Sequence, residues 1–291
     1  MNSFSSFHPT VLLLYYVVVI VVTTCTMNPI VIGCSVIGSL LFFIVTNSSR
    51  FIIKEFAFYL LVFILIAITN LLFVHNGETI LFFMNDNPIT FEAGMSGISI
   101  ASMIISVIFW NKSYSKVISS DKVIFLFGKA IPRLVIFISI LLRIVPMFKK
   151  QFLKVNQAQK ALGFYTSDSM TDRLFGGFRV FKSTLIWALE HAFSKSDSMK
   201  ARGYGLKGRT NFSIFKWQRR DFLLLIYIFT LCVVFIGAME TFYFYYYPVM
   251  ANLEFSFVIY LQYIGVFLLM VVPSIVEIKE NIQWRFLRSR I

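Results

Sequence analysis

The sequence predicts an all-α integral membrane protein with about six transmembrane helices and two long amphipathic cytoplasmic helices. Of its 291 residues, 58% are apolar and only 14% are charged, and the mean hydropathy is +0.77. Soluble domains average about 25% charged residues, so this composition could not cover a core with polar surface. The apolar residues are grouped in long runs, and the cations are grouped between them. These three observations exclude a soluble enzyme.

Six apolar runs are long enough, or nearly so, to cross a hydrocarbon core, which takes about 20 helical residues. They cover residues 11–26, 30–46, 57–75, 93–110, 222–239 and 255–276. The first two are short and are joined only by Met27-Asn28-Pro29. Proline can begin a helix but cannot continue one, so we expect a tight helical hairpin here. We expect no signal peptide, because the first ten residues lack a basic segment and no small-residue cleavage site follows Leu14.

The charge distribution orients these spans. The chain has 27 Lys and Arg against 14 Asp and Glu, a formal net charge of +13. The connections at 27–29, 76–92 and 240–254 contain neither Lys nor Arg. Because Lys and Arg near span ends favour the cytoplasmic side, these connections are expected outside and both termini inside. We therefore divide the chain into N-terminal spans at 1–122, a central segment at 123–220, and C-terminal spans with a basic tail at 221–291.

Residues 148–220 of the central segment hold over half of the cations and have helical periodicity. One predicted helix, near 148–163, gathers apolar residues on one face: Phe148, Phe152, Val155 and Leu162. A second, near 178–203, does the same with Phe178, Phe181, Leu185, Leu189 and Ala192. Between them, Thr166-Ser167-Asp168-Ser169 is typical of a turn with an N-cap. We expect two amphipathic helices lying under the membrane.

Residues 123–147, which precede these helices, are apolar but interrupted by charges and prolines. A simple span here would place the basic segment outside the cell, against the charge rule. A membrane-surface or re-entrant helix is therefore the better prediction. The basic helices beyond it would also contact anionic lipid.

The two amphipathic helices end alike. Lys160-Ala161-Leu162-Gly163-Phe164 and Lys200-Ala201-Arg202-Gly203-Tyr204 are offset by 40 residues. Glycine after a last helical turn is the usual left-handed cap, so these could be two ordinary helix ends. Alternatively, they dock on two similar partners. The guanidinium of Arg202 would then pair with a carboxylate, whereas Leu162 would make only an apolar contact.

A strip of small residues marks the fourth span. Ala93, Gly97 and Ala101 recur every four residues, a spacing that lets membrane helices approach closely. This strip indicates either packing within the chain or a docking face for another membrane subunit. The aromatic run at 242–247 is most simply an outer interfacial belt.

Catalytic and cofactor-binding patterns are absent from the sequence. The nearest approach to a phosphate-binding loop, at 177–183, is too short and has Phe181 where the second glycine belongs. The three histidines are scattered, and the three cysteines lie in apolar runs without metal-ligand spacing. We expect no catalytic residue, cofactor or metal, and no nucleic-acid partner. If ATP drives this protein, the ATP is bound by partner proteins.

Several segments together resemble the transmembrane T component of energy-coupling factor (ECF) transporters, the EcfT/CbiQ family. The resemblance covers most of the chain. It rests on Pro9 with Asn28-Pro29, Asn76-Gly77-Glu78-Thr79, Asp86-Asn87-Pro88-Ile89-Thr90, Asp121-Lys122, Leu142-Arg143-Ile144-Val145-Pro146, Ala158-Gln159-Lys160-Ala161, and Ala201-Arg202-Gly203-Tyr204-Gly205 continuing through Leu206-Lys207-Gly208-Arg209-Thr210. The last run is the most specific of these.

The resemblance implies a noncatalytic coupling subunit of an ABC-type importer in the cell membrane of a prokaryote. Family members carry Ala-Arg-Gly motifs at the ends of two coupling helices, which contact a pair of cytoplasmic ATPases. By the resemblance, Ala201, Arg202 and Gly203 form one motif, and Ala161, Leu162 and Gly163 form the other. Motion would pass to one substrate-binding membrane subunit that takes up a vitamin or a metal ion.

This chain departs from the family pattern at two places. Leu162 stands where arginine is expected, and the N-terminal Asp-Pro-Arg signature is reduced to His8-Pro9-Thr10. The alternative function is a stand-alone membrane carrier or channel. It is weakened by the near absence of ionisable residues inside the spans, which coupled carriers usually keep near the midplane. An intramembrane enzyme is weaker still, because no acid, base or nucleophile cluster is present.

Overall fold

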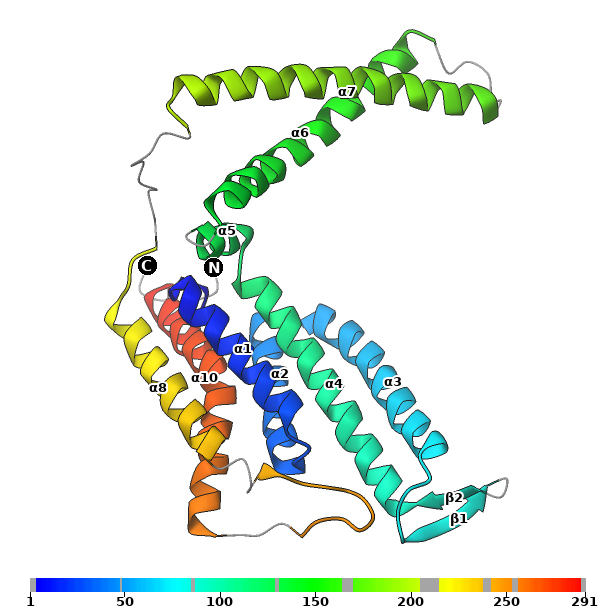
Figure 1. Ribbon diagram of the computed structural model, residues 1–291, viewed down its shortest axis with the longest axis vertical. Coiled ribbons are helices and arrows are strands. Elements are labelled where there is room, and N and C mark those ends of the chain that lie inside the picture. Colours follow the sequence, from blue (N-terminus) through cyan, green and yellow to red (C-terminus); the bar gives the residue numbers. More distant parts are fainter. Residues whose placement is uncertain are drawn as a thin grey trace. The chain divides into compact units, whose positions relative to one another are not determined.

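The computed structural model describes most of the chain. The residues described are 4–47, 49–84, 87–128, 131–163, 170–204, 215–237, 242–252 and 256–288. In chain order (Figure 1) the elements are η1 (Phe4–Ser6), α1 (Pro9–Cys25), α2 (Pro29–Thr46), α3 (Ser49–Phe73), β1 (Ile80–Met84), β2 (Asn87–Thr90), α4 (Phe91–Val117), α5 (Ser120–Gly128), α6 (Pro132–Ala161), α7 (Met170–Ala201), α8 (Arg219–Gly237) and α10 (Phe257–Arg288).

All six predicted spans are helices, and the predicted all-α membrane protein is confirmed. They correspond to α1, α2, α3, α4, α8 and α10. Within the described residues, the last five are long and apolar enough to cross a membrane, whereas α1 is apolar but has 17 residues. The tight hairpin between α1 and α2 is also present. Proline begins both helices, and the Asn28 side chain caps α2 by accepting from the backbone N–H of Ile30.

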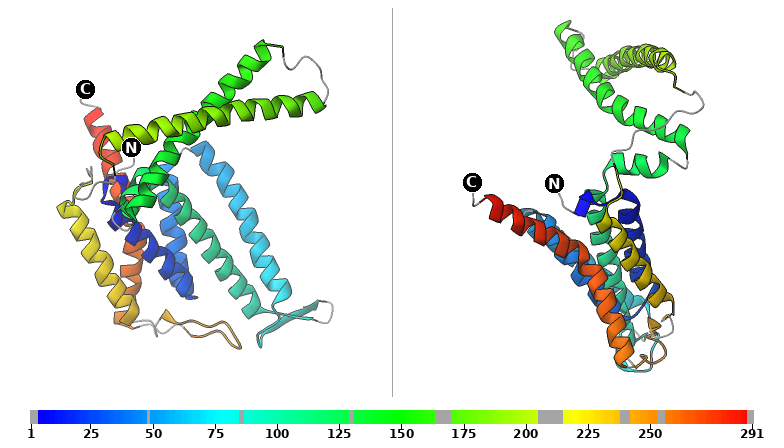
Figure 2. Two further views of the ribbon diagram at one scale, coloured as in Figure 1. Left: turned by 45° about the horizontal axis from the view of Figure 1, so that its top comes forward. Right: turned by 90° about the vertical axis from the view of Figure 1, so that its left-hand side faces the viewer.

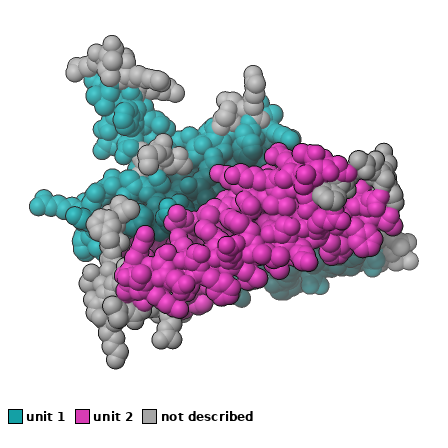
Figure 3. Space-filling model, turned by 90° about the horizontal axis from the view of Figure 1, so that it is seen from above, with its two compact units in different colours: residues 1–123, 215–291 teal, residues 124–214 magenta. Residues whose placement is uncertain are grey.

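The chain forms two compact units, coloured separately in Figure 3. The first comprises residues 1–123 and 215–291, and the second comprises residues 124–214. In the first unit α2 packs against α10 on one side and α4 on the other, and α3 packs against α4 (Figures 1 and 2). Its core is rich in buried aromatic rings, including Phe4, Tyr15, Tyr16, Phe42 and Trp110.

Charged side chains of the first unit form hydrogen bonds with the main chain of the segment before α1. Asp221 accepts the backbone N–H of His8 at 3.0 Å, and Glu277 accepts that of Phe4 at 3.2 Å. The ammonium group of Lys122 donates to the backbone carbonyls of Ser5 and Val117. Burial lowers the pKa of Lys122, because desolvation penalises the charged form. Each of these three buried charged side chains thus bonds to the main chain of residues 4–8.

Strands β1 and β2 pair antiparallel, which the sequence analysis did not predict. The base of this pair is fixed by Glu92, whose carboxylate accepts the N–H of Thr79 at 3.3 Å and its hydroxyl at 2.8 Å. Gly77 beside it has φ 132°, and a Cβ there would lie 2.6 Å from Glu92 Oε2. These contacts depend on a side chain 13 residues away, so local propensity does not reveal them.

The aromatic run at 242–247 is only partly the interfacial belt that we expected. Phe242, Phe244 and Tyr246 are buried, whereas Tyr243 and Tyr245 are exposed. Burial alternates along the run, so half of its rings pack inward. Tyr246 anchors it, because its hydroxyl pairs with Ser99 Oγ at 2.6 Å and lies 3.1 Å from the Met27 carbonyl.

In the second unit, two predicted helix boundaries were wrong. The first amphipathic helix was expected to begin near 148, after a separate helix at 123–147. Instead α5 is short, and α6 runs without a break from Pro132 to Ala161 with Pro146 inside it. An interior proline removes one backbone donor and crowds the carbonyl four residues earlier, which disfavours a helix locally, but this helix continues through Pro146. The second helix, α7, begins at Met170 rather than near 178.

Candidate functional site

The candidate site is built on α6 and α7, which pack together and cross one another (Figures 1 and 2). On α6, Phe148, Phe152 and Val155 are half-buried, as the predicted apolar face requires. Leu162 does not share that environment, because it lies beyond the last helical residue and is 72% exposed. On α7, the buried residues are Gly176, Val180 and Thr184, spaced four apart. We infer that this strip faces α6, since α6 is the element with which α7 has substantial contact.

The apolar face predicted for α7 is a different one. Phe178, Phe181, Leu185 and Leu189 are 44–69% exposed. At 100° per residue they lie on the side of α7 opposite Gly176 and Val180. Small and β-branched side chains therefore pack the two helices together, and the larger apolar side chains remain uncovered by the described residues of the chain.

The end of α6 is closed by a left-handed glycine. Ala161 is the last helical residue, and the N–H of Leu162 still donates to the Ala158 carbonyl at 3.1 Å. Gly163 has φ 78°, and its N–H donates to the Lys160 carbonyl at 3.1 Å. A positive φ is costly for residues with a Cβ, so glycine is the natural residue here.

The end of α7 repeats this geometry 40 residues later. The N–H of Arg202 donates to the Ser198 carbonyl at 3.2 Å, and that of Gly203 donates to Lys200 at 2.9 Å. Gly203 has φ 72°, and the N–H of Tyr204 reaches back to the Met199 carbonyl at 3.1 Å. The last two bonds make a Schellman cap. The similar sequences at the two ends thus have a similar backbone.

Both ends expose the residues that the sequence analysis selected. Ala161, Leu162, Ala201 and Arg202 are exposed, and Gly203 is half-exposed. Lys160 and Lys200 lie in the last turns, where a cation favours the negative end of a helix dipole. Within the two three-residue motifs the chemical difference is at the middle position: α7 has a guanidinium that can form two bonds to an anion, and α6 has an isobutyl group. The turn predicted at 166–169 and the run 206–210 lie outside the described residues.

The small-residue strip of α4 packs within the chain. Ala93 and Ala101 are fully buried, and a Cβ on Gly97 would lie 3.0 Å from the Ala67 carbonyl oxygen and from Asn70 Cβ. Both of those residues belong to α3. This is the internal packing that the sequence left open as one of two interpretations.

Comparison with known proteins adds an independent line of observation. No protein-family model matches the chain. Over 95 residues it is 37% identical to the energy-coupling factor transporter transmembrane protein EcfT of Listeria innocua, and over 104 residues it is 31% identical to EcfT of Lactobacillus helveticus. The chain is therefore similar to EcfT proteins over about a third of its length.

The resemblance to the EcfT family that the sequence predicted is confirmed by these matches. The aligned residues make up 32% and 35% of this chain. The matches span only 36% and 38% of the length of the two EcfT relatives.

Proposed function

We propose that this chain is the membrane coupling component of an ECF-type importer. Its spans at 1–122 and 221–291 sit in the cell membrane of a prokaryote, with both termini and residues 123–220 in the cytoplasm. Two cytoplasmic ATPases bind the ends of α6 and α7. A separate membrane subunit binds the substrate, a vitamin or a metal ion. The chain itself is noncatalytic.

One observation carries this proposal: two helices of one unit end in the same exposed, glycine-capped geometry. Ala161-Leu162-Gly163 and Ala201-Arg202-Gly203 share backbone bonds at equivalent positions. A pair of similar surface features suits a pair of similar partners. The apolar helices support a membrane location, and the similarity to proteins named as ECF transmembrane proteins supports a role in this class of transporter.

The proposed mechanism follows from the stiffness of α6 and α7. Helices of 30 and 32 residues are about 45 Å long or more, because each residue rises 1.5 Å. When the two ATPases close on ATP, the helix ends they hold are displaced. Because the two helices pack together, this displacement moves them as a pair and re-orients the captured substrate-binding subunit.

Charge reversal at Arg202 tests the proposal. The affinity-tagged chain is expressed with the ATP-binding subunits that co-purify with the wild type. Arg202→Glu is expected to lower their recovery by about 30-fold or more, because breaking a desolvated charge pair costs roughly 2 to 5 kcal/mol of association.

Lys182→Glu is the matched control. It makes the same change of charge on an exposed residue of α7, far along the helix from its end. Its ATPase recovery should equal that of wild type. Equal recovery with Arg202→Glu would contradict the coupling role of this helix end.

A further inference from the structure

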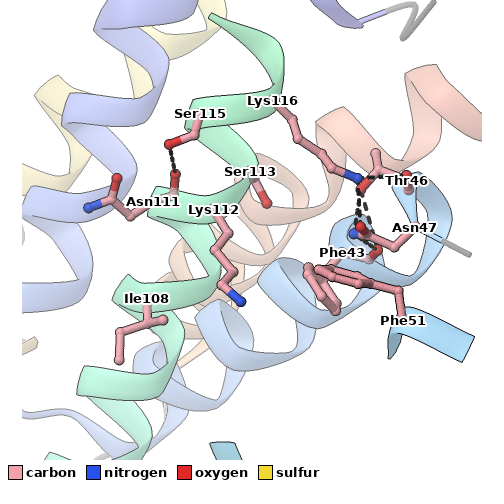
Figure 4. Close-up of a pocket in the computed structure, with 10 residues that line it drawn as sticks. All are labelled: Phe43, Thr46, Asn47, Phe51, Ile108, Asn111, Lys112, Ser113, Ser115 and Lys116. Carbon is pink, nitrogen blue, oxygen red and sulfur yellow. Dashed lines mark hydrogen bonds between the residues drawn. The ribbon is translucent and has the colours of Figure 1, made fainter. Parts of the chain in front are cut away.

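A cavity opens where α2, α3 and α4 meet (Figure 4). Its volume is 430 Å³, and all of its lining residues belong to the first unit. Phe43, Phe51 and Ile108 form an apolar part, and Lys112 and Lys116 bring two ammonium groups. The cavity therefore combines apolar surface with positive charge, which suits an amphiphilic anion better than a purely polar or a purely apolar molecule.

The two lysines are held in place by different partners. Lys112 pairs with Glu55, and its ammonium nitrogen lies 4.6 Å from the centre of the Tyr59 ring. Lys116 donates to the Thr46 carbonyl at 3.1 Å and to Asn47 Oδ1 at 2.6 Å. Both acceptors of Lys116 are uncharged. An ammonium group has three donors, so one donor of Lys116 remains for a further acceptor.

The charge around the cavity is not balanced in the described part of the chain. Glu55 offsets Lys112, and the charge of Lys116 is left over. Lys54 adds another exposed cation in the first turns of α3. Unbalanced cations beside apolar surface favour an anion as the occupant, since pairing offsets the cost of removing charge from water.

The cavity also lies at the ends of the spans that border it. Thr46 is the last residue of α2, Lys116 is one residue from the end of α4, and Phe51 lies in the first turn of α3. None of the span residues of α3 is buried, so this helix presents apolar side chains to lipid along its length. The phosphate of a phospholipid lies where hydrocarbon-spanning helices end, and its acyl chains continue along the apolar surface.

We infer that this cavity binds an anionic phospholipid. Lys112 and Lys116 pair with its phosphate group, and one acyl chain lies along Phe43, Phe51 and Ile108. A soluble phosphate ester offers the same headgroup charge but has no chain for the apolar part. The inference does not depend on the proposed transport function.

Native mass spectrometry of the full chain in mild detergent tests this site. The chain is titrated with phosphatidylglycerol and, in parallel, with phosphatidylcholine. Wild type should bind phosphatidylglycerol more tightly. Lys116→Gln should weaken that binding about fivefold, the effect of one lysine on an anionic lipid surface. The double variant Lys112→Gln/Glu55→Gln should weaken it similarly, although its net charge is unchanged.

Lys54→Gln is the matched control, because it removes one exposed cation from the same region without touching the cavity lining. It should bind phosphatidylglycerol as wild type does. Equal weakening in Lys54→Gln and Lys116→Gln would show diffuse attraction and overturn the site. So would unchanged binding in both cavity variants, or equal binding of the two lipids.

Glycerol 3-phosphate distinguishes the two sources of a phosphate group. Added at the concentration of the lipid, it should displace no phosphatidylglycerol. Displacement at that concentration would overturn the assignment to lipid. Circular dichroism of each variant checks that its helices are intact, so that lost binding reports on the cavity.

Discussion

Ser35 connects three helices through one hydroxyl group. Its Oγ lies 2.8 Å from Thr23 Oγ1 of α1 and 2.6 Å from Ser106 Oγ of α4, and it accepts the indole N–H of Trp110 at 3.0 Å. All four side chains are buried. In a lipid-surrounded core no bulk water can replace a lost partner, so a hub of this kind stabilises one arrangement of α1, α2 and α4.

Ser35→Ala should therefore destabilise the chain. It leaves Trp110 without its acceptor, and an unsatisfied buried polar group costs about 1 to 3 kcal/mol. Unfolding temperature in mild detergent, followed by tryptophan fluorescence, measures the effect. Ser115→Ala is the control, because among the described residues that exposed hydroxyl bonds only to the Asn111 carbonyl of its own helix. A Ser35→Ala protein as stable as Ser115→Ala would contradict the role of the hub.

Leu162 is a second residue at which a substitution has a testable effect. It is 72% exposed at the α6 position equivalent to Arg202. Leu162→Arg should raise ATPase recovery with the tagged chain, because a guanidinium adds two directed bonds to a carboxylate. Leu162→Gln adds a polar group without charge and should leave recovery near wild type. Lower recovery with Leu162→Arg would indicate that the partner of α6 presents an apolar or basic surface.

The contact between α2 and α10 shows how closely two helices approach in this fold. A Cβ added to Gly38 would lie 2.6 Å from Met270 Cβ and 2.7 Å from its carbonyl oxygen. Backbone atoms cannot move away as the end of a flexible side chain can. Glycine is thus required at this crossing by the neighbouring helix rather than by its own φ.

Gly38→Ala should push α2 and α10 apart and destabilise the chain by about 1 to 3 kcal/mol, the usual cost of overpacking. Gly33→Ala is an internal control on the same helix, because no atom of the described residues lies within 4 Å of its added Cβ. Thermal unfolding of both variants in detergent provides the comparison. If the two substitutions have equal effects, helix propensity rather than close packing governs this position.

The two units of the chain differ in their apolar and charged residues. Spans formed from both ends of the sequence meet in one unit, and the helices with the two glycine-capped ends form the other. The connections without Lys or Arg include the β1–β2 hairpin, and the basic residues cluster in the other unit. The charge rule predicts that these two regions lie on opposite sides of the membrane.

Cysteine labelling in intact cells tests that orientation. In a background lacking Cys25, Cys34 and Cys232, Asn87→Cys in β2 and Ser198→Cys in α7 each place a thiol at an exposed position. A membrane-impermeant maleimide should label Asn87→Cys only, and both should react after lysis. Labelling of Ser198→Cys in intact cells would contradict the proposed topology.

The sequence by itself determined the spans, their predicted orientation and the two helix ends. Apolar runs and the cation distribution reflect whether a segment lies in lipid or in water, and a segment's own composition largely decides this. The Ala-Leu-Gly and Ala-Arg-Gly ends could be predicted for a similar reason. A left-handed cap needs glycine at one position of the last turn, so Gly163 and Gly203 identify it locally.

Only the tertiary structure decided which faces find partners within the chain. It placed Gly176 and Val180, rather than Phe178 and Phe181, on the buried side of α7, and it turned alternate rings of the 242–247 run inward. It also joined Lys112 to Glu55 across 57 residues and built the cavity beside them. Periodicity shows that a helix has an apolar side, but the element that covers that side is set by contacts between residues far apart in sequence.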